Sequence, residues 1–180
     1  MTKDEKIEIP LSKSKITLIL LGAVAFAAIG LWFVISPPKI NSALFGNPVL
    51  IFLAGVAAIL MFPVVGFLGL KKLMDKKPGL IIDKTGITDN ASGASAGHIP
   101  WSDITEIRTT QIFSQKFLTV FVRNPNEYIE RQTNALKRKN MQMSLNSNGS
   151  PINISANTLQ CNFEELKNTL QTQFDSNRIN

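Results

Sequence analysis

The sequence predicts an α+β membrane protein, in which a hairpin of two transmembrane helices precedes one soluble domain of antiparallel strands and helices. Three observations support this fold class. Two long runs, at residues 16–35 and 49–70, contain no charged residue. Later segments alternate short Ile-, Val- and Thr-rich stretches with turn residues, which is typical of strands. Apolar residues between Phe163 and Phe174 recur at helical spacing.

Each of the two apolar runs is long enough to cross a bilayer. A helix rises about 1.5 Å per residue, so the first run spans roughly 30 Å, the thickness of the hydrocarbon core. In lipid the backbone must satisfy its own hydrogen bonds, which favours helices. We expect the segment 36–38, Ser-Pro-Pro, to end the first helix. Asn47 is placed as the N-cap of the second helix, and Pro48 as its first residue.

The distribution of lysine predicts the orientation of the hairpin. The leader of about fifteen residues carries acidic residues and precedes a long apolar run, so we interpret that run as a retained anchor rather than a signal peptide. Lysines flank the hairpin at its two terminal sides, whereas the loop at 36–48 holds only Lys39. By the positive-inside rule, both termini then face the cytoplasm. These flanking lysines are Lys3, Lys6, Lys13 and Lys15 before the hairpin, and Lys71, Lys72, Lys76 and Lys77 after it.

Small residues and one proline mark candidate helix–helix contacts in the hairpin. Pro63 lies inside the second run and is expected to kink it. Small side chains allow two helices to approach closely. We favour packing within the hairpin itself, and the alternative is a contact face for another membrane subunit. The candidate residues are Ala23, Ala27, Gly30, Pro63, Gly66 and Gly69.

Composition argues against an enzyme or a metalloprotein. Cys161 is the only cysteine and His98 the only histidine, which excludes an internal disulfide and a zinc site of clustered thiolates and imidazoles. No phosphate loop or nucleophile elbow is present, and no catalytic residue, metal ligand or cofactor is predicted. The net charge of +6 follows largely from the lysines that flank the hairpin, so nucleic acid is not expected as a partner.

The soluble domain is predicted from local patterns. Asn162 and Glu165 have the spacing of a capping box at the start of the last helix. One helix is expected over 127–142, a polar loop over 146–150, and strands at 80–82, 87–89, 98–101, 104–113, 117–122, 152–154 and 159–161. A bent antiparallel sheet closed by a C-terminal amphipathic helix is the pleckstrin-homology (PH) architecture, here with an inserted helix. The chain then divides into a leader (1–15), a first transmembrane helix (16–35), an external loop (36–48), a second transmembrane helix (49–70), a basic linker (71–78), a PH-like domain (79–175) and a frayed tail (176–180).

Several segments carry a resemblance to a known family. They are EIPLSKSK (8–15), KKPGLIIDKTGITDN (76–90), HIPWSDI (98–104), NPNEYI (124–129) and PINISANTLQCNFEEL (151–166). With them the chain resembles a family of bacterial two-span inner-membrane proteins that bear a cytosolic PH-like domain. The resemblance covers nearly the whole chain and implies bacterial origin, an inner-membrane location and a PH-like fold. It implies no activity and no catalytic residues.

Individual residues of the soluble domain allow two interpretations. Trp101, Ser102 and Asp103 form either a binding edge or, as we favour, a core tryptophan beside a turn. Tyr128 is expected to pack on the sheet, and His98 to be a half-exposed strand residue. Cys161 is expected to be buried and inert.

Two basic groups are candidate contacts with anionic lipid, although topology and a solvated helix face also explain them. The residues are Lys71, Lys72, Lys76, Lys77, Arg131, Lys137, Arg138 and Lys139. The leading functional hypothesis is a non-enzymatic, membrane-tethered adaptor that binds a protein partner. The alternatives are an anionic-lipid-responsive module and a small accessory subunit of a larger membrane complex. The sequence names neither the partner nor the oligomeric state.

Overall fold

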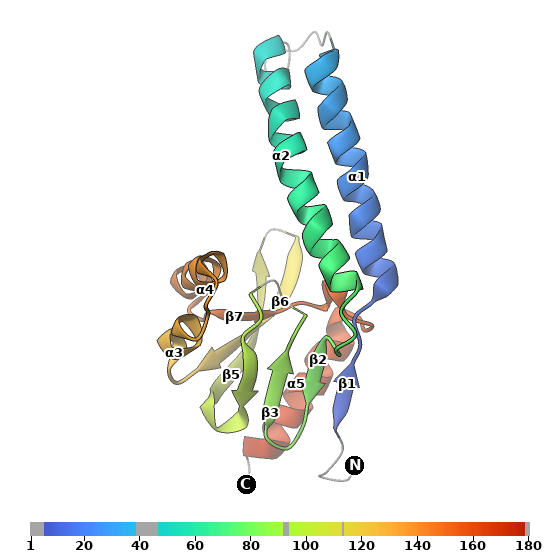
Figure 1. Ribbon diagram of the computed structural model, residues 1–180. Helices are drawn as coiled ribbons and strands as arrows, with labels where there is room; N and C mark the ends of the chain where they lie inside the picture. The colour runs from blue at the N-terminus through green and yellow to red at the C-terminus, as the bar shows by residue number, and fades with distance from the viewer. Residues whose placement is uncertain (1–5, 39–46, 92–93, 113, 179–180) are drawn as a thin grey trace. The chain divides into compact units, whose positions relative to one another are not determined.

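The computed structural model describes residues 6–38, 47–91, 94–112 and 114–178 (Figure 1). The chain forms two compact units. We call the segment Lys13–Lys76 the hairpin unit, and the segments Met1–Ser12 and Lys77–Asn180 together the sheet unit. The sheet unit is therefore built from both ends of the chain, with the hairpin unit inserted between its first strand and the rest.

The hairpin unit consists of α1 (Lys13–Ile35) and α2 (Pro48–Leu73). Both helices are long and apolar enough to cross a membrane, and most of their apolar side chains are exposed. The expected end of the first helix and the expected start of the second are confirmed: α1 ends directly before Ser36, and the Asn47 side chain accepts a 2.9 Å hydrogen bond from the backbone N–H of Val49. The helices extend beyond the predicted runs at their other ends, to Lys13 and to Leu73. The helix α2 includes Pro63.

The two helices of the hairpin pack closely at a pair of glycines. A Cβ atom on Gly30 would lie 2.7 Å from Ala58 Cβ and 3.0 Å from Gly55 O. A Cβ atom on Gly55 would lie 2.7 Å from Gly30 O. Neither position has room for a side chain larger than hydrogen, so the backbones of the two helices are in direct contact here. Gly30 was among the contacts predicted from sequence, whereas Gly55 was not.

The strands form two antiparallel sheets. The first contains β1 (Ile7–Ile9), β2 (Leu80–Ile82), β3 (Gly86–Asp89) and β4 (Gly97–Pro100), in that order. The second contains β5 (Ile104–Ile112), β6 (Gln115–Val122) and β7 (Ile152–Ile154), also in that order. A short 3₁₀ helix, η1 (Trp101–Asp103), joins β4 to β5.

The first strand comes from the leader, which was predicted to lie outside the soluble domain. Residue pairs Ile7–Ile82 and Ile9–Leu80 set the register of β1 against β2. Leu11 then forms an isolated bridge with Leu159. Three residues are too few to show an alternating pattern, so only the tertiary structure identifies this strand.

Three helices complete the sheet unit, and two of them differ from the prediction. Instead of one helix over 127–142, there are α3 (Pro125–Glu130) and α4 (Ala135–Asn148). The break occurs because the Asn134 side chain caps α4, accepting hydrogen bonds from the backbone N–H groups of Leu136 (2.9 Å) and Lys137 (3.2 Å). The predicted loop at 146–150 is also wrong, since α4 continues to Asn148 and ends at Gly149, where φ is 77°.

The last helix, α5 (Phe163–Arg178), carries the predicted capping box. Asn162 Oδ1 accepts from the N–H of Glu165, and Glu165 Oε2 accepts from the N–H of Asn162, both at 2.9 Å. The helix extends through Arg178, into the segment expected to be frayed. The predicted strand at 159–161 is wrong: a 3₁₀ helix, η2 (Ala156–Thr158), comes first, and then only Leu159 pairs, in the isolated bridge with Leu11.

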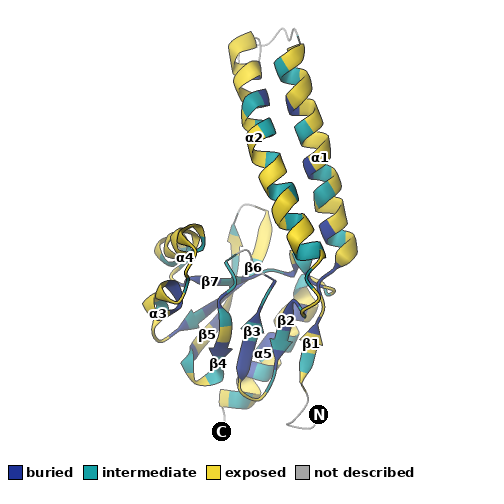
Figure 2. Ribbon diagram, viewed as in Figure 1, coloured by how far each residue is buried: buried dark blue, intermediate teal, exposed yellow. Residues whose placement is uncertain are grey.

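The core of the sheet unit lies where α5 packs against the sheets. The helix contacts β5, β6 and η1 through its buried face of Leu166, Leu170 and Phe174. Figure 2 shows the buried residues concentrated along the strands and on this helix. Full burial of each such side chain contributes about 1.5–3 kcal/mol to stability. The sheet residues exposed by less than 2 % include Leu80, Ile82, Ile87, Ile99, Leu118, Val120 and Ile154.

Candidate functional site

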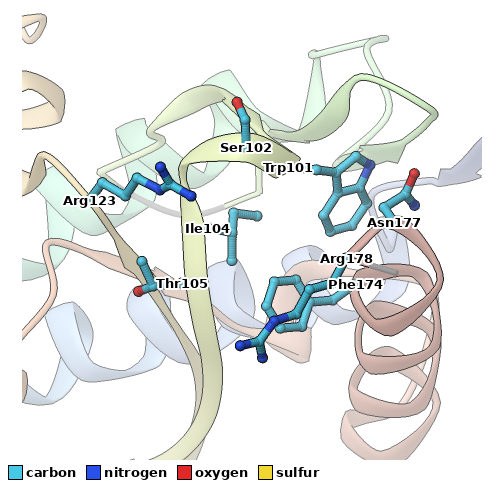
Figure 3. A pocket seen from close by; sticks show the side chains of 8 residues that line it. All are labelled: Trp101, Ser102, Ile104, Thr105, Arg123, Phe174, Asn177 and Arg178. Atoms are coloured by element: carbon cyan, nitrogen blue, oxygen red, sulfur yellow. The ribbon is translucent and has the colours of Figure 1, made fainter. Parts of the chain in front are cut away.

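A pocket of about 410 Å³ opens on the sheet unit beside the end of α5 (Figure 3). Its walls come from η1, from the start of β5, from the residue that follows β6 and from the last turn of α5. These elements are far apart in sequence and meet because α5 crosses the sheet at the β4–β5 corner. The lining residues are Trp101, Ser102, Ile104, Thr105, Arg123, Phe174, Asn177 and Arg178.

The floor of the pocket is apolar. Ile104 and Phe174 are buried, and the rings of Trp101 and Phe174 lie 6.5 Å apart between centroids. The indole of Trp101 is fixed, because its Nε1–H donates a 2.8 Å hydrogen bond to the backbone oxygen of Asp83. Asp83 is itself held in a turn by Thr85, whose backbone N–H donates to the Asp83 carboxylate at 2.7 Å. The aromatic surface is therefore preorganised.

The rim of the pocket is positively charged. Arg123 and Arg178 are both exposed, and Figure 3 shows their guanidinium groups directed toward the space in front of Ile104. Neither arginine forms an ion pair in the described part of the chain. Arg178 lies over Phe174, with its Cζ 5.9 Å from the ring centroid. No carboxylate is among the residues that line the pocket, so two guanidinium charges remain available to a ligand.

The carboxylate of Asp103, a residue between Ser102 and Ile104 in the sequence, is engaged in a hydrogen bond. Asp103 Oδ2 accepts a 2.7 Å hydrogen bond from the hydroxyl of Tyr128, a side chain with no exposed surface. Burial, together with this hydrogen bond, raises the pKa of Tyr128 above its ordinary range. Arg131 covers the same ring at 4.6 Å and pairs with Glu127. Asp103 thus serves to anchor α3 to η1.

The side chains at this pocket complement an anion that carries an apolar group. Two guanidinium groups match the oxygens of a carboxylate or phosphate, and the aromatic floor accepts an apolar group attached to it. The hydroxyls of Ser102 and Thr105 have no histidine beside them, because His98 lies on β4 and pairs with Thr88 at 3.1 Å. In the described residues, no group of His, Cys, Asp and Glu is arranged to hold a metal ion.

Some of the soluble-domain residues considered in the sequence analysis line the pocket, and others lie elsewhere. Trp101 and Ser102 line the pocket, and the favoured prediction of a core tryptophan is wrong, because Trp101 is only half-buried. Tyr128 is fully buried. His98 is exposed. The expectation that Cys161 is buried is wrong, since it is partly exposed in the turn before α5, where no strand forms.

The basic candidates fall on different elements. Lys71 and Lys72 end α2, and Lys76 and Lys77 follow it in the sequence. Arg131 is engaged by Glu127 and Tyr128, whereas Lys137, Arg138 and Lys139 lie together on α4.

The hairpin candidates differ in how closely they are packed. Ala23 and Gly30 are buried, Ala27 is half-buried, and Gly69 closely approaches Leu20. A Cβ atom added at Gly66 would have no neighbouring atom within 4 Å. Gly66 therefore lies in open space, unlike Gly30 and Gly69.

Neither arginine of the pocket was predicted from sequence. Arg178 follows Phe174 by four residues, one helical turn along the apolar face of α5, and this spacing was a usable signal. For Arg123 the sequence carried no such signal, because this residue reaches the pocket only through the pairing of β5 with β6. Comparison with known protein families, with curated proteins and with solved structures found no match to this chain. Function is therefore inferred from the geometry of the pocket and from the two apolar helices.

Proposed function

We propose that this chain is a membrane-tethered, non-enzymatic binding module whose sheet unit holds an acidic, partly apolar segment of a partner protein. The observation that carries the proposal is the pocket that Arg123 and Arg178 line together with the rings of Trp101 and Phe174. Within the described part of the chain, neither arginine forms an ion pair. A peptide carboxylate next to a large apolar side chain complements both features. Pockets of a few hundred Å³ are the usual size for one such anchor.

A PH-like fold is the second part of the proposal. Four antiparallel strands, then three more, then a C-terminal amphipathic helix give the order expected of that architecture. The first strand is supplied by the leader, which explains how seven strands fit. The two helices between β6 and β7 are an insertion into that plan.

Attachment to the cytoplasmic face of a bacterial inner membrane is the third part. Two apolar helices and the lysines beside them favour it, under the positive-inside rule. The pairing of β1 with β2 adds an independent argument. The strand β1 precedes the hairpin and β2 follows it, so the two strands can pair only if they lie on the same side of the membrane. Two membrane spans between them satisfy this condition.

The test uses the full chain with an N-terminal tag, so that the pocket beside Arg178 is unobstructed. The protein in mild detergent is exposed to an array of synthetic peptides in which Asp or Glu adjoins Leu or Phe, alongside matched peptides with Asn or Gln. Preferential binding of the acidic peptides is expected, and Arg123→Gln with Arg178→Gln should weaken it at least tenfold, since each charge-assisted pair contributes about 1.5–3 kcal/mol.

The matched control removes the same charge elsewhere. Lys84 and Arg108 are exposed, and neither lines the pocket, so Lys84→Gln with Arg108→Gln should leave peptide binding unchanged. Equal binding of acidic and amide peptides, or equal loss in both double variants, would contradict the proposal. Binding partners are then identified by co-purification from native membranes, comparing the unaltered chain with the Arg123, Arg178 double variant.

An accessory subunit of a larger membrane complex is a second candidate function. The specific observation that favours it is on α2, where Pro63 is exposed and the space beside Gly66 is open. These two residues therefore do not hold the hairpin together, and they are free to meet another membrane helix.

A further inference from the structure

Helix α4 displays apolar side chains that the sheet unit elsewhere hides. Among the described residues of the sheet unit, the large hydrophobic side chains that are exposed are Leu136 (64 %) and Met143 (59 %), both on α4. They are seven residues apart, which is close to two helical turns, so they lie on one face. Lys139 and Asn140 lie between them on that face, and both are exposed. We call Leu136, Lys139, Asn140 and Met143 the α4 stripe.

The opposite face of α4 is committed to the core. Met141 is fully buried, and Ser144 accepts a 2.6 Å hydrogen bond from the side-chain amide of Asn153 on β7. Asn134 and Gly149 cap the two ends. The α4 stripe is therefore held outward on a fixed helix.

The stripe is flanked by positive charge. Helix α4 contains Lys137, Arg138 and Lys139 and no acidic residue. None of the three forms an ion pair in the described part of the chain, and Arg138 donates a 2.9 Å hydrogen bond to the backbone oxygen of Gln132. Glu130 is the one acidic residue that lines the hollow beside Arg138 and Lys139. The surface combines two apolar anchors with a net positive charge.

We propose that the α4 stripe docks on the anionic lipid leaflet next to the membrane-spanning hairpin, with Leu136 and Met143 entering the interface. This inference goes beyond the proposed peptide binding and does not depend on the pocket. A lipid surface is favoured over a protein partner because the connection is short. Helix α2 ends at Leu73 and β2 begins at Leu80, so residues 74–79 reach at most about 20 Å.

Because this short linker keeps the sheet unit close to the membrane, weak contacts are sufficient to dock helix α4 on the lipid. A short linker converts docking into an intramolecular step with a high effective concentration. Each basic side chain near an anionic leaflet increases the association constant by about fivefold. Two large apolar side chains and three cations therefore suit an interfacial helix that binds reversibly.

The experiment places a fluorescent reporter within the stripe of the full chain. Asn140→Cys, in a Cys161→Ser background, is labelled with an environment-sensitive dye and reconstituted into nanodiscs of phosphatidylcholine, with or without phosphatidylglycerol. We expect a blue shift and quenching by spin-labelled lipid only in the anionic nanodiscs. Both effects should diminish at high salt.

Two variants separate the contribution of the charges from that of the apolar side chains. A dye on another helix tests whether the response is specific to α4. Arg138→Gln with Lys139→Gln should reduce the ratio of docked to free protein by roughly twenty-five-fold, because two charges are lost. Leu136→Ser with Met143→Ser should abolish lipid quenching, while the folded state is checked by circular dichroism. The same dye at Asn168→Cys, exposed on α5, should not respond. Identical spectra in both lipid compositions, or an equal response at Asn168→Cys, would overturn the proposal.

Discussion

Ile9, which precedes the first apolar helix, lies opposite Leu80, which follows the second, in an antiparallel pair of strands. The side chain of Ile9 is 8 % exposed and that of Leu80 is fully buried. The pair joins two parts of the chain that the whole hairpin separates. Folding of the sheet unit therefore requires that both ends of the hairpin emerge in the same compartment.

The first prediction concerns this topology. Cys161 is the only cysteine and is partly exposed, so it reports the side on which the sheet unit lies. In intact cells, a membrane-permeant maleimide should label it, whereas an impermeant maleimide should not. Ser36→Cys in a Cys161→Ser background should be labelled by both reagents, because residue 36 follows α1 at the far end of the hairpin. Labelling of Cys161 by the impermeant reagent in intact cells would reverse the proposed orientation.

The second prediction concerns the contribution of β1 to stability. Ile9 and Leu11 are both buried, and loss of their burial should cost about 3–6 kcal/mol. That is a large part of the roughly 5–15 kcal/mol that stabilises a typical domain. Residues 77–180 expressed alone should therefore aggregate or unfold at low denaturant. The same residues preceded by residues 6–12 on a flexible Gly/Ser linker should fold cooperatively in urea titrations. Equal stability of the two forms would show that β1 is dispensable.

Much of the fold was predictable because its signals are local. Uncharged runs of about twenty residues, the Asn47–Pro48 helix start and the Asn162–Glu165 capping box each lie within a short window, and each was found. The missed first strand has a non-local cause. β1 gains its stability from pairing with β2, far along the chain, and its three residues carry no periodicity.

The candidate site was less predictable than the fold. Trp101 drew attention from its sequence context, but Arg123 and Arg178 are far apart in sequence and meet only after α5 docks on the sheet. The break between α3 and α4 had a local signal in Asn134, which was predicted to lie inside one continuous helix. Because that break turns Leu136 and Met143 outward on a separate helix, missing it also hid the α4 stripe.

The third prediction concerns the hydrogen bond from Tyr128 to Asp103. Tyr128→Phe removes a bond to a charged acceptor in a buried place, so the free energy of unfolding should fall by about 1.5–3 kcal/mol. In a Trp32→Phe background, Trp101 fluorescence reports unfolding of the sheet unit alone, since the chain has two tryptophans. A change below about 0.5 kcal/mol would show that the bond contributes little.

The fourth prediction uses the ionisation of the same residue. Burial first, and then the hydrogen bond to Asp103, raise the pKa of Tyr128 in the folded state. A raised pKa stabilises the folded state fully below the unfolded-state value of about 10, and this contribution is lost as the pH rises from that value through the folded-state pKa. Tyr128 is the only tyrosine, so tyrosinate absorbance follows it alone. The native protein should show no tyrosinate at a pH where urea-unfolded protein is fully ionised, whereas coincident titrations would contradict the burial of the hydroxyl.

The last prediction separates packing inside the hairpin from contact with another membrane protein. Gly55→Leu should disrupt the hairpin, because even a Cβ atom there would lie 2.7 Å from Gly30 O and 2.9 Å from Phe33 Cβ. Gly66→Leu should leave the isolated protein intact, since a Cβ atom added there would meet no side chain and no other helix within 4 Å. Thermal unfolding of both variants in detergent provides the comparison, with a lower midpoint expected for Gly55→Leu only. If Gly66→Leu keeps the midpoint but loses a protein that co-purifies with the unaltered chain, then the open face of α2 is a subunit contact. If Gly66→Leu keeps every co-purifying protein, the hairpin serves as an anchor, and binding belongs to the sheet unit.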